Sequence, residues 1–220
     1  MTYQCHAVDL PGFGENEQHA ETIEDVAHFV FQFMDNNKID KACVIGHSMG
    51  GYVALEMLHF NPLRIDAIGL VHSHAAVDAE SKMENRRKLI AFIDKNGSEQ
   101  FLKEFAKQLI SPKQKEHGLR GQAFELVKLT SSESVISATK AMLIRKDHLA
   151  TLSTNKPTLW IIGRNDTFMP YNEVLRQAQL SPNSVILTLK DVGHLCMYEA
   201  PQKTLEIVKD FLHKVETSTQ

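Results

Sequence analysis

The sequence predicts an α/β fold in which a mostly parallel sheet is covered by helices. Short apolar runs, typical of buried parallel strands, occur in both halves of the chain. Segments with apolar residues at helical spacing alternate with these runs. The composition, 43% hydrophobic and 23% charged over 220 residues, is that of a globular protein large enough to bury a substantial core.

Five apolar runs are predicted strands, at residues 4–8, 42–46, 65–71, 158–162 and 185–189. A first helix should begin at Thr22, because Asp25 follows three residues later and can complete a capping box. Residues 52–58 are apolar nearly all round and predict a buried helix. A final helix is predicted near the C-terminus from the spacing of Leu205, Val208, Phe211 and Leu212.

The middle of the chain lacks strand signals. From about residue 75 to residue 152, polar amphipathic segments follow one another, separated by turn signals such as Asn96-Gly97 and Ser111-Pro112. We therefore predict a core formed by residues 1–74 and 153–220 and a helical cap, or lid, formed by residues 75–152. Because this insertion leaves after one strand and returns before the next, it should cover the strand ends where α/β proteins bind ligands.

Charge and cysteine content narrow the function classes. With 24 Lys+Arg, 27 Asp+Glu and a net charge of -3, the chain has no basic stripe for nucleic acid. No apolar run approaches the ~20 residues of a membrane span, and no signal peptide is evident. Cys5, Cys43 and Cys196 are an odd number, mostly within apolar runs, and predict buried free thiols. We expect a cytoplasmic protein whose partner is a small molecule.

One motif indicates nucleophilic catalysis. Residues 46–50 read Gly-His-Ser-Met-Gly, with a predicted strand before them and a predicted helix after them. A sharp turn of this kind presents Ser48 at the top of the sheet, should require glycine neighbours for lack of room, and directs the Met49 N–H toward a forming oxyanion. The plainer alternative is a glycine-rich turn with a bystander serine.

A serine nucleophile needs a histidine base and a carboxylate to orient it. Asp166 follows the predicted strand 158–162, and His194 follows the predicted strand 185–189. The order Ser, Asp, His is the one used by a strand-turn-helix nucleophile of this type. Asp191 lies close to His194 in sequence and is a rival acid.

Other polar and aromatic residues have plainer interpretations. His72 and His74 flank Ser73 after a predicted strand, and solvent or hydrogen-bonding roles are favoured over substrate contact or a metal site. Cys196 is interpreted as a buried small hydrophobe. The phenylalanines of the insertion, Phe92, Phe101, Phe105 and Phe124, are assigned to packing between helices rather than to ligand contact.

These motifs together resemble the α/β-hydrolase superfamily, of the cap-bearing serine esterase and lactonase type. They are residues 9–14 (Asp-Leu-Pro-Gly-Phe-Gly), the turn at 46–51, the acid loop at 163–170, and Val-Gly-His at 192–194 with Glu-Ala-Pro at 199–201. The resemblance implies Ser48 as nucleophile, His194 as general base and acid, Asp166 as its orienting partner and Met49 as one oxyanion donor. It implies no cofactor and no metal.

The chain departs from this family at its N-terminus. Members usually begin with further strands and a His-Gly loop that supplies the second oxyanion N–H. We therefore expect the N-terminal strands to be missing and favour a fragment. The alternatives are that the predicted strands 4–8 and 42–46 pair directly or that a partner fills the gap between them. Self-association through unpaired strand edges is also possible.

The function expected from these residues is hydrolysis of a small carboxylic ester, thioester or lactone through an acyl-enzyme intermediate. One alternative is a ligand-binding or catalytically impaired relative with an incomplete oxyanion hole. A C–C bond hydrolase or a cofactor-free peroxidase using the same three residues is another.

Overall fold

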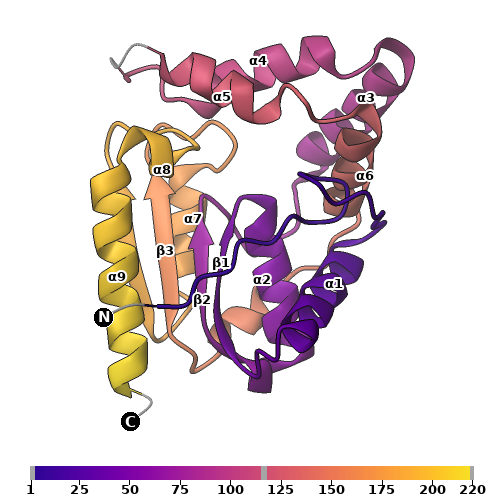
Figure 1. Ribbon diagram of the computed structural model, residues 1–220. Helices are drawn as coiled ribbons and strands as arrows, with labels where there is room; N and C mark the ends of the chain where they lie inside the picture. The colour runs from indigo at the N-terminus through magenta and orange to yellow at the C-terminus, as the bar shows by residue number, and fades with distance from the viewer. Residues whose placement is uncertain (1–2, 115–117, 219–220) are drawn as a thin grey trace.

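The protein forms a four-stranded parallel sheet in a computed structural model that describes residues 3–114 and 118–218. The strands are β1 (Ala42–His47), β2 (Ile65–Val71), β3 (Thr158–Gly163) and β4 (Ser184–Leu189), and they lie in the order β1-β2-β3-β4 (Figure 1). The predicted α/β class is therefore confirmed. Parallel strands place their carboxyl ends at one edge, so the loops that follow β1, β2, β3 and β4 meet there.

Helices cover both faces of the sheet (Figure 1). Trp160 and Ile162 of β3 pack with the helices α1 (Ile23–Asn36), α2 (Met49–Phe60) and α7 (Tyr171–Ala178). Leu159 and Ile161, which point to the opposite face, pack with Phe211 of α9 (Pro201–Ser218). This alternation along a strand explains why β3 reads as a continuous apolar run.

Helix α1 has the predicted capping box, and helix α2 is buried as predicted. Thr22 caps α1, accepting a hydrogen bond from the Asp25 N–H at 3.0 Å, while the Asp25 carboxylate accepts from the Thr22 N–H at 2.9 Å. Every residue of α2 from 51 to 58 is buried. Two short helical turns, η1 (Pro62–Arg64) and α8 (Cys196–Glu199), complete this part of the fold.

The stretch between β2 and β3 is helical in its described residues. It contains α3 (Glu80–Asn96), α4 (Glu99–Leu109), α5 (Leu119–Val127), α6 (Ser132–Leu143) and the turn η2 (Ala150–Ser153). In Figure 1, α4 and α5 lie beyond the carboxyl ends of the strands. The His194 N–H donates to the Leu109 carbonyl at 2.8 Å, which ties the end of α4 to the loop after β4. Whether residues 75–152 form a separate cap remains a prediction.

The predicted strand at residues 4–8 is wrong. These residues have no regular structure, and most of their side chains are exposed. In the described part of the chain, β1 pairs only with β2, so residues 4–8 have no neighbouring strand to complete a hydrogen-bonded ladder. The segment instead crosses to α1, where the His6 and Phe33 rings meet edge to face at 5.8 Å.

The three cysteines are free thiols with different environments. Cys196 is buried as predicted, Cys43 is partly buried, and Cys5 is exposed because it lies in the irregular segment before β1. The prediction of buried thiols is therefore wrong for Cys5. None of the helices in the described residues is both long and apolar enough to cross a membrane.

Candidate active site

The turn between β1 and α2 holds Ser48 in a strained backbone conformation. Ser48 has φ 51° and ψ -116°, a region that a residue with a side chain rarely adopts. A Cβ on Gly46 would lie 2.0 Å from the Gly50 carbonyl oxygen, and one on Gly51 would lie 2.3 Å from Ser73 Oγ. Lack of room therefore explains glycine at 46 and 51. It does not explain glycine at 50, where a Cβ would have no neighbour within 4 Å among the described residues, so the sequence prediction is wrong there.

The next residue, Met49, begins α2. The first N–H groups of a helix have no acceptor within the helix and carry the positive end of its dipole. The Met49 N–H therefore belongs to a group of amides suited to a developing negative charge beside Ser48.

Asp166 and His194 are brought together from the loops after β3 and β4. His194 Nδ1 lies 2.7 Å from Asp166 Oδ2, and both side chains are almost completely buried. The rival acid does not reach this position. Asp191 has a 56% exposed side chain and lies 3.9 Å from Lys113. Of the two candidate carboxylates, only Asp166 is placed to orient His194.

Hydrogen bonds keep the Asp166 carboxyl ionised. Burial by itself would raise the pKa of Asp166, but hydrogen bonds from His194 and His72 outweigh this effect and hold the pKa well below its usual range. Oδ1 accepts the backbone N–H groups of Phe168 at 2.9 Å and Met169 at 3.1 Å. An ionised Asp166 accepts hydrogen bonds only, so His194 Nδ1 must carry a proton and its Nε2 is left as the basic nitrogen.

The environment of His194 favours its neutral form. Burial lowers the pKa of His194 below its ordinary value, and the hydrogen bond to Asp166 opposes that shift. Neutral His194 can accept a proton, as a general base must. Among the described residues, no hydrogen bond joins Ser48 Oγ to His194. In enzymes of this kind that contact often tightens only when substrate is bound.

Three further histidines surround the pair. His72 Nδ1 lies 2.9 Å from Asp166 Oδ2, and His74 Nε2 lies 3.2 Å from the Tyr52 hydroxyl. Both side chains are buried, so the hydrogen-bonding interpretation holds and the solvent interpretation is wrong. His47 was not singled out from the sequence. Its Nε2–H donates to the His194 carbonyl at 2.7 Å, and burial lowers its pKa to about 3.

The cluster of His72, Asp166 and His194 also has the residue types of a metal site. His72, Asp166 and His194 each offer one ligand atom within 4.8 Å of one another. The two hydrogen bonds to Asp166 Oδ2, at 2.7 and 2.9 Å, account for that spacing. We therefore treat the cluster as a hydrogen-bond network.

Aromatic side chains connect the helical stretch to this network. The ring of Phe168 lies 5.0 Å from the ring of His194, and Phe105 of α4 meets Phe168 edge to face at 5.3 Å. Phe105 stacks on Phe101 of the same helix at 5.3 Å. It also packs against a cluster that contains Leu119 and Ala123 of α5, so it packs between helices as predicted and contacts the acid loop as well. Phe168 was missed from the sequence, although its position two residues after Asp166 was the available signal.

An ionic cluster lies beside the site at the start of α3. The buried Asp78 carboxylate pairs with Arg145 at 3.0 Å, Arg86 at 2.6 Å and Lys82 at 3.3 Å. Lys82 Nζ also donates to the Phe168 carbonyl at 3.2 Å. These bonds attach the beginning of the helical stretch to the acid loop.

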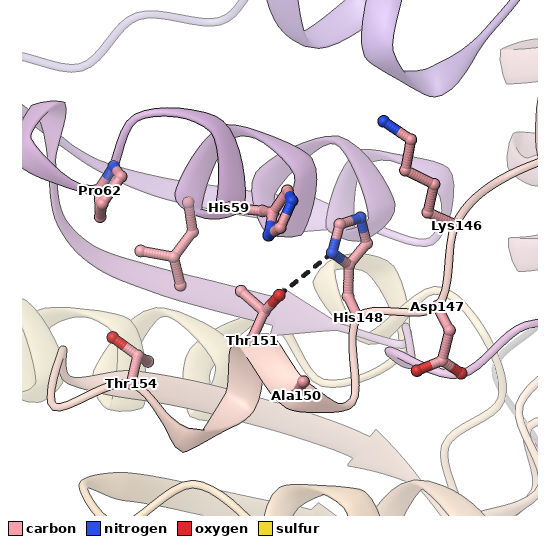
Figure 2. A pocket seen from close by; sticks show the side chains of 9 residues that line it. His59, Pro62, Lys146, Asp147, His148, Ala150, Thr151 and Thr154 are labelled. Carbon is pink, nitrogen blue, oxygen red and sulfur yellow. Dashed lines mark hydrogen bonds between the residues drawn. The ribbon is translucent and has the colours of Figure 1, made fainter.

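A separate pocket of about 350 Å³ lies between the C-terminal end of α2 and η2 (Figure 2). His59, Lys146, His148 and Thr151 are among its lining residues, and His148 Nδ1 lies 3.2 Å from the Thr151 hydroxyl. His148 Nε2 lies 2.7 Å from the buried Glu56 carboxylate, which gives it a structural partner. Neither Ser48, Asp166 nor His194 lines this pocket, so it is distinct from the candidate active site.

The chain is similar in sequence to several known proteins over most of its length. The chain is 26% identical over 218 residues to a dihydrolipoyllysine-residue acetyltransferase component of an acetoin cleaving system from Pseudomonas putida, covering 94% of this chain and 56% of that protein. It is also 26% identical to a putative esterase/lipase from Mycoplasma genitalium, covering 94% of this chain and 78% of the relative.

Among solved structures, a thermophilic esterase from Thermogutta terrifontis superposes with a TM-score of 0.87 at 26% identity, covering 94% of this chain and 78% of the esterase. The family model described as alpha/beta hydrolase fold matches residues 2–201. The predicted family is thereby confirmed, and the esterase relatives support its assignment as a hydrolase. The strained turn at Ser48, the parallel sheet and this match together show that the chain belongs to the α/β hydrolase fold family.

Proposed function

We propose that the protein is a serine hydrolase that cleaves a small carboxylic ester, thioester or lactone through an acyl-enzyme intermediate. The observation that carries this proposal is the buried 2.7 Å hydrogen bond between His194 and ionised Asp166, at the same sheet edge as the strained Ser48. A network that leaves a neutral imidazole nitrogen free at this edge is suited to removing a proton from a hydroxyl.

The first half of the reaction acylates Ser48. Its Oγ attacks the substrate carbonyl carbon while His194 Nε2 accepts the hydroxyl proton. The carbonyl oxygen becomes an oxyanion, and the Met49 N–H donates to it. Asp166 stabilises the imidazolium that forms. When the tetrahedral intermediate collapses, the bond to the leaving group breaks and His194 returns the proton to the departing alkoxide or thiolate.

The second half releases the acyl group. His194 Nε2 accepts a proton from water as the water oxygen attacks the acyl carbon. The bond to Ser48 Oγ then breaks, and His194 returns the proton to that oxygen. Neither half needs an oxidant or reductant.

Covalent labelling by a fluorophosphonate tests the nucleophile directly. We expect wild-type protein to gain one adduct at Ser48, located by peptide mass spectrometry, and Ser48→Ala to gain none. Ser73→Ala is the matched control because Ser73 is a buried serine with no hydrogen-bond partner among the described residues. It should label like wild type. A folded wild-type protein that does not label would contradict the proposal and favour the ligand-binding alternative.

A panel of chromogenic esters, thioesters and lactones with graded acyl chains then identifies the substrate class. The C–C bond hydrolase and peroxidase alternatives predict labelling of Ser48 with little turnover of any ester. Turnover of at least one ester at a rate that Ser48→Ala lowers by about 10⁴-fold or more would exclude both.

The setting of this activity is also part of the proposal. We propose a cytoplasmic enzyme that acts on small molecules rather than on nucleic acid or a membrane surface. The net charge of -3 and the free thiols support this setting.

A further inference from the structure

The proposed mechanism leaves one side chain of the network without a role. His72 follows β2 directly, and its side chain has no exposed surface. Its imidazole contacts Asp166, and it shares one carboxylate oxygen of that residue with the imidazole of His194.

That oxygen is Asp166 Oδ2. It accepts from His194 Nδ1 at 2.7 Å and from His72 Nδ1 at 2.9 Å, while Oδ1 accepts two backbone N–H groups. The carboxylate is therefore held by four donors, two on each oxygen. Because both imidazoles face an ionised oxygen, both must carry their protons on Nδ1.

The fold places His72 here despite local costs. His72 has φ 48°, a left-handed conformation that is unfavourable for a residue with a Cβ. Its Nε2 is buried and has no hydrogen-bond partner among the described residues. A buried polar atom left unpaired and a strained backbone each destabilise the folded state.

The neighbouring strand makes room for the ring. The His72 N–H donates to the Ile161 carbonyl of β3 at 2.9 Å, which fixes its backbone beside the strand that carries Asp166. A Cβ on Gly163 would lie 2.3 Å from the Gly193 carbonyl oxygen, 2.6 Å from the Val192 carbonyl oxygen and 2.8 Å from His72 Cε1, so the missing side chain at 163 makes room for the loop after β4 and for the imidazole. A strained backbone and an unpaired buried nitrogen at one position point to a function for this ring.

We infer that His72 is a positioning residue for the catalytic acid: its Nδ1–H holds the Asp166 oxygen that orients His194 and limits how strongly that oxygen binds the His194 proton. This inference rests on the proposed serine hydrolase function. His72 does not touch the reacting atoms, and it acts through Asp166.

The physical reason is that two donors share one oxygen. Each hydrogen bond draws charge from Oδ2, so the carboxylate stabilises the His194 imidazolium less than it would with His194 as its single side-chain donor. A less basic His194 stays neutral, and able to act as a base, at lower pH. The second donor also prevents the carboxyl from rotating away when His194 becomes protonated.

Other charged and titratable groups around His194 must be separated from this effect. His47 of β1 lies 4.8 Å from the His194 ring, and burial keeps it neutral, with a pKa of about 3. Lys82 of α3 lowers the pKa of His194 through its positive charge, as a smaller contribution than burial. Neither contacts Asp166 by a hydrogen bond, so changes at His72 are distinguishable from changes at these groups.

The first experiment observes the shared oxygen without relying on activity. Protein with ¹⁵N-labelled histidine should show two strongly deshielded, slowly exchanging Nδ1–H protons by nuclear magnetic resonance, one from His194 and one from His72. His72→Asn should remove one of the two. A single Nδ1–H signal that His72→Asn leaves in place would overturn the inference, whatever the enzyme hydrolyses.

The second experiment compares two substitutions in the proposed hydrolase. Asn places an amide N–H near the position of His Nδ1 and tolerates a positive φ, so His72→Asn should fold and keep the donor to Asp166. His72→Leu removes the donor. We expect His72→Leu to move the acid limb of kcat/KM upward by about half a pH unit or more and to lower kcat/KM at its optimum by about tenfold. His72→Asn should keep the wild-type acid limb.

A loss of rate in both variants with an unchanged acid limb would show that His72 is merely structural and would overturn the inference. His74→Asn is the control for damage to this loop, because His74 is buried two residues away and contacts Tyr52 rather than Asp166. It should not move the acid limb. If wild-type protein neither labels with fluorophosphonate nor turns over esters, the proposed function fails, and the resonance experiment still decides whether His72 holds Asp166.

Discussion

Two of the three strands that lead to the candidate catalytic residues, β1 and β3, differ sharply in burial. All six residues of β3, which leads to Asp166, are buried between two neighbouring strands and helices on both faces. In β1, which leads to Ser48, only Gly46 is fully buried, and Ile45 is 38% exposed. In the described part of the chain, β1 has a neighbouring strand on one side only.

The difference shows two ways of positioning a reactive group. At the β3 end, Asp166 is held by four hydrogen bonds in a nearly dry interior, where such bonds are strong. At the β1 end, Ser48 is held by steric contacts of the backbone, because the main chain at Gly50 approaches Gly46 too closely for a side chain at 46. Changes at the β3 end should therefore act through charge and protonation, and changes at the β1 end through steric overlap.

Apart from removal of the nucleophile itself, the largest effect should come from the acid. Asp166→Asn replaces an acceptor of two imidazole N–H groups by an amide that also donates, so His194 loses its tautomer and orientation. We expect kcat to fall by about 10³- to 10⁴-fold. Asp191→Asn is the matched control, since its exposed carboxylate faces Lys113, and its ester turnover should be unchanged. A comparable loss in both variants would show that the acid is misassigned.

Steric overlap at the turn should give the next largest effect. Gly46→Ala would place a Cβ 2.0 Å from a backbone oxygen, which no side-chain movement relieves. We expect it to destabilise the fold by about 3 kcal/mol or more. Gly50→Ala meets open space inside a helix and should change stability by about 1 kcal/mol or less, in the stabilising direction. Urea unfolding of the two variants measures the contrast, and equal losses would contradict the steric account.

Acid pH should lower the free energy of unfolding through the buried histidines near the active site. Burial lowers the pKa values of His47 and His74 to about 3, below the value of about 6.5 in an unfolded chain. The unfolded state then binds more protons than the native state between these values, so stability is complete above about pH 6.5 and falls as the pH drops toward 3. Each histidine contributes about 1.4 kcal/mol per pH unit in this window.

Thermal melting between pH 7.5 and 4.5 measures this loss, and His74→Asn should reduce its slope. The acid limb of kcat/KM should lie below pH 6.5, because burial lowers the pKa of His194. A limb well above pH 7 would show that His194 is more basic than its environment indicates.

The smallest effect should come from the aromatic contact with the helical stretch. Phe105→Ala removes the ring that packs on Phe168 beside His194, without touching the reacting groups. We expect kcat/KM to change by about 2- to 10-fold, and unevenly across an ester panel. Phe92→Ala is the control because Phe92 is 37% exposed on α3, and it should leave every ester unaffected. Equal losses for all esters in Phe105→Ala would point to damaged folding.

Much of this protein was readable from its sequence because the signals are local. Apolar runs and helical spacing predicted all four strands of the sheet and the helices beside them, and the capping box at Thr22 was predicted residue by residue. Strand-end placement was enough to nominate Ser48, Asp166 and His194 as candidates, with Asp191 as a rival acid, since the carboxyl ends of parallel strands meet at one edge.

Other features depended on contacts that no local pattern records. Residues 4–8 have the composition of a strand but no strand neighbour in the part of the chain that the structure describes, and a strand forms only where its backbone groups are paired. Gly50 has room for a side chain that the motif suggested it lacked. The choice of Asp166 over Asp191, and the second histidine on its oxygen, followed from the pairing of β2 with β3 and β3 with β4. Hydrogen bonds between residues 94 positions apart depend on which strands become neighbours, and only the tertiary structure decides that.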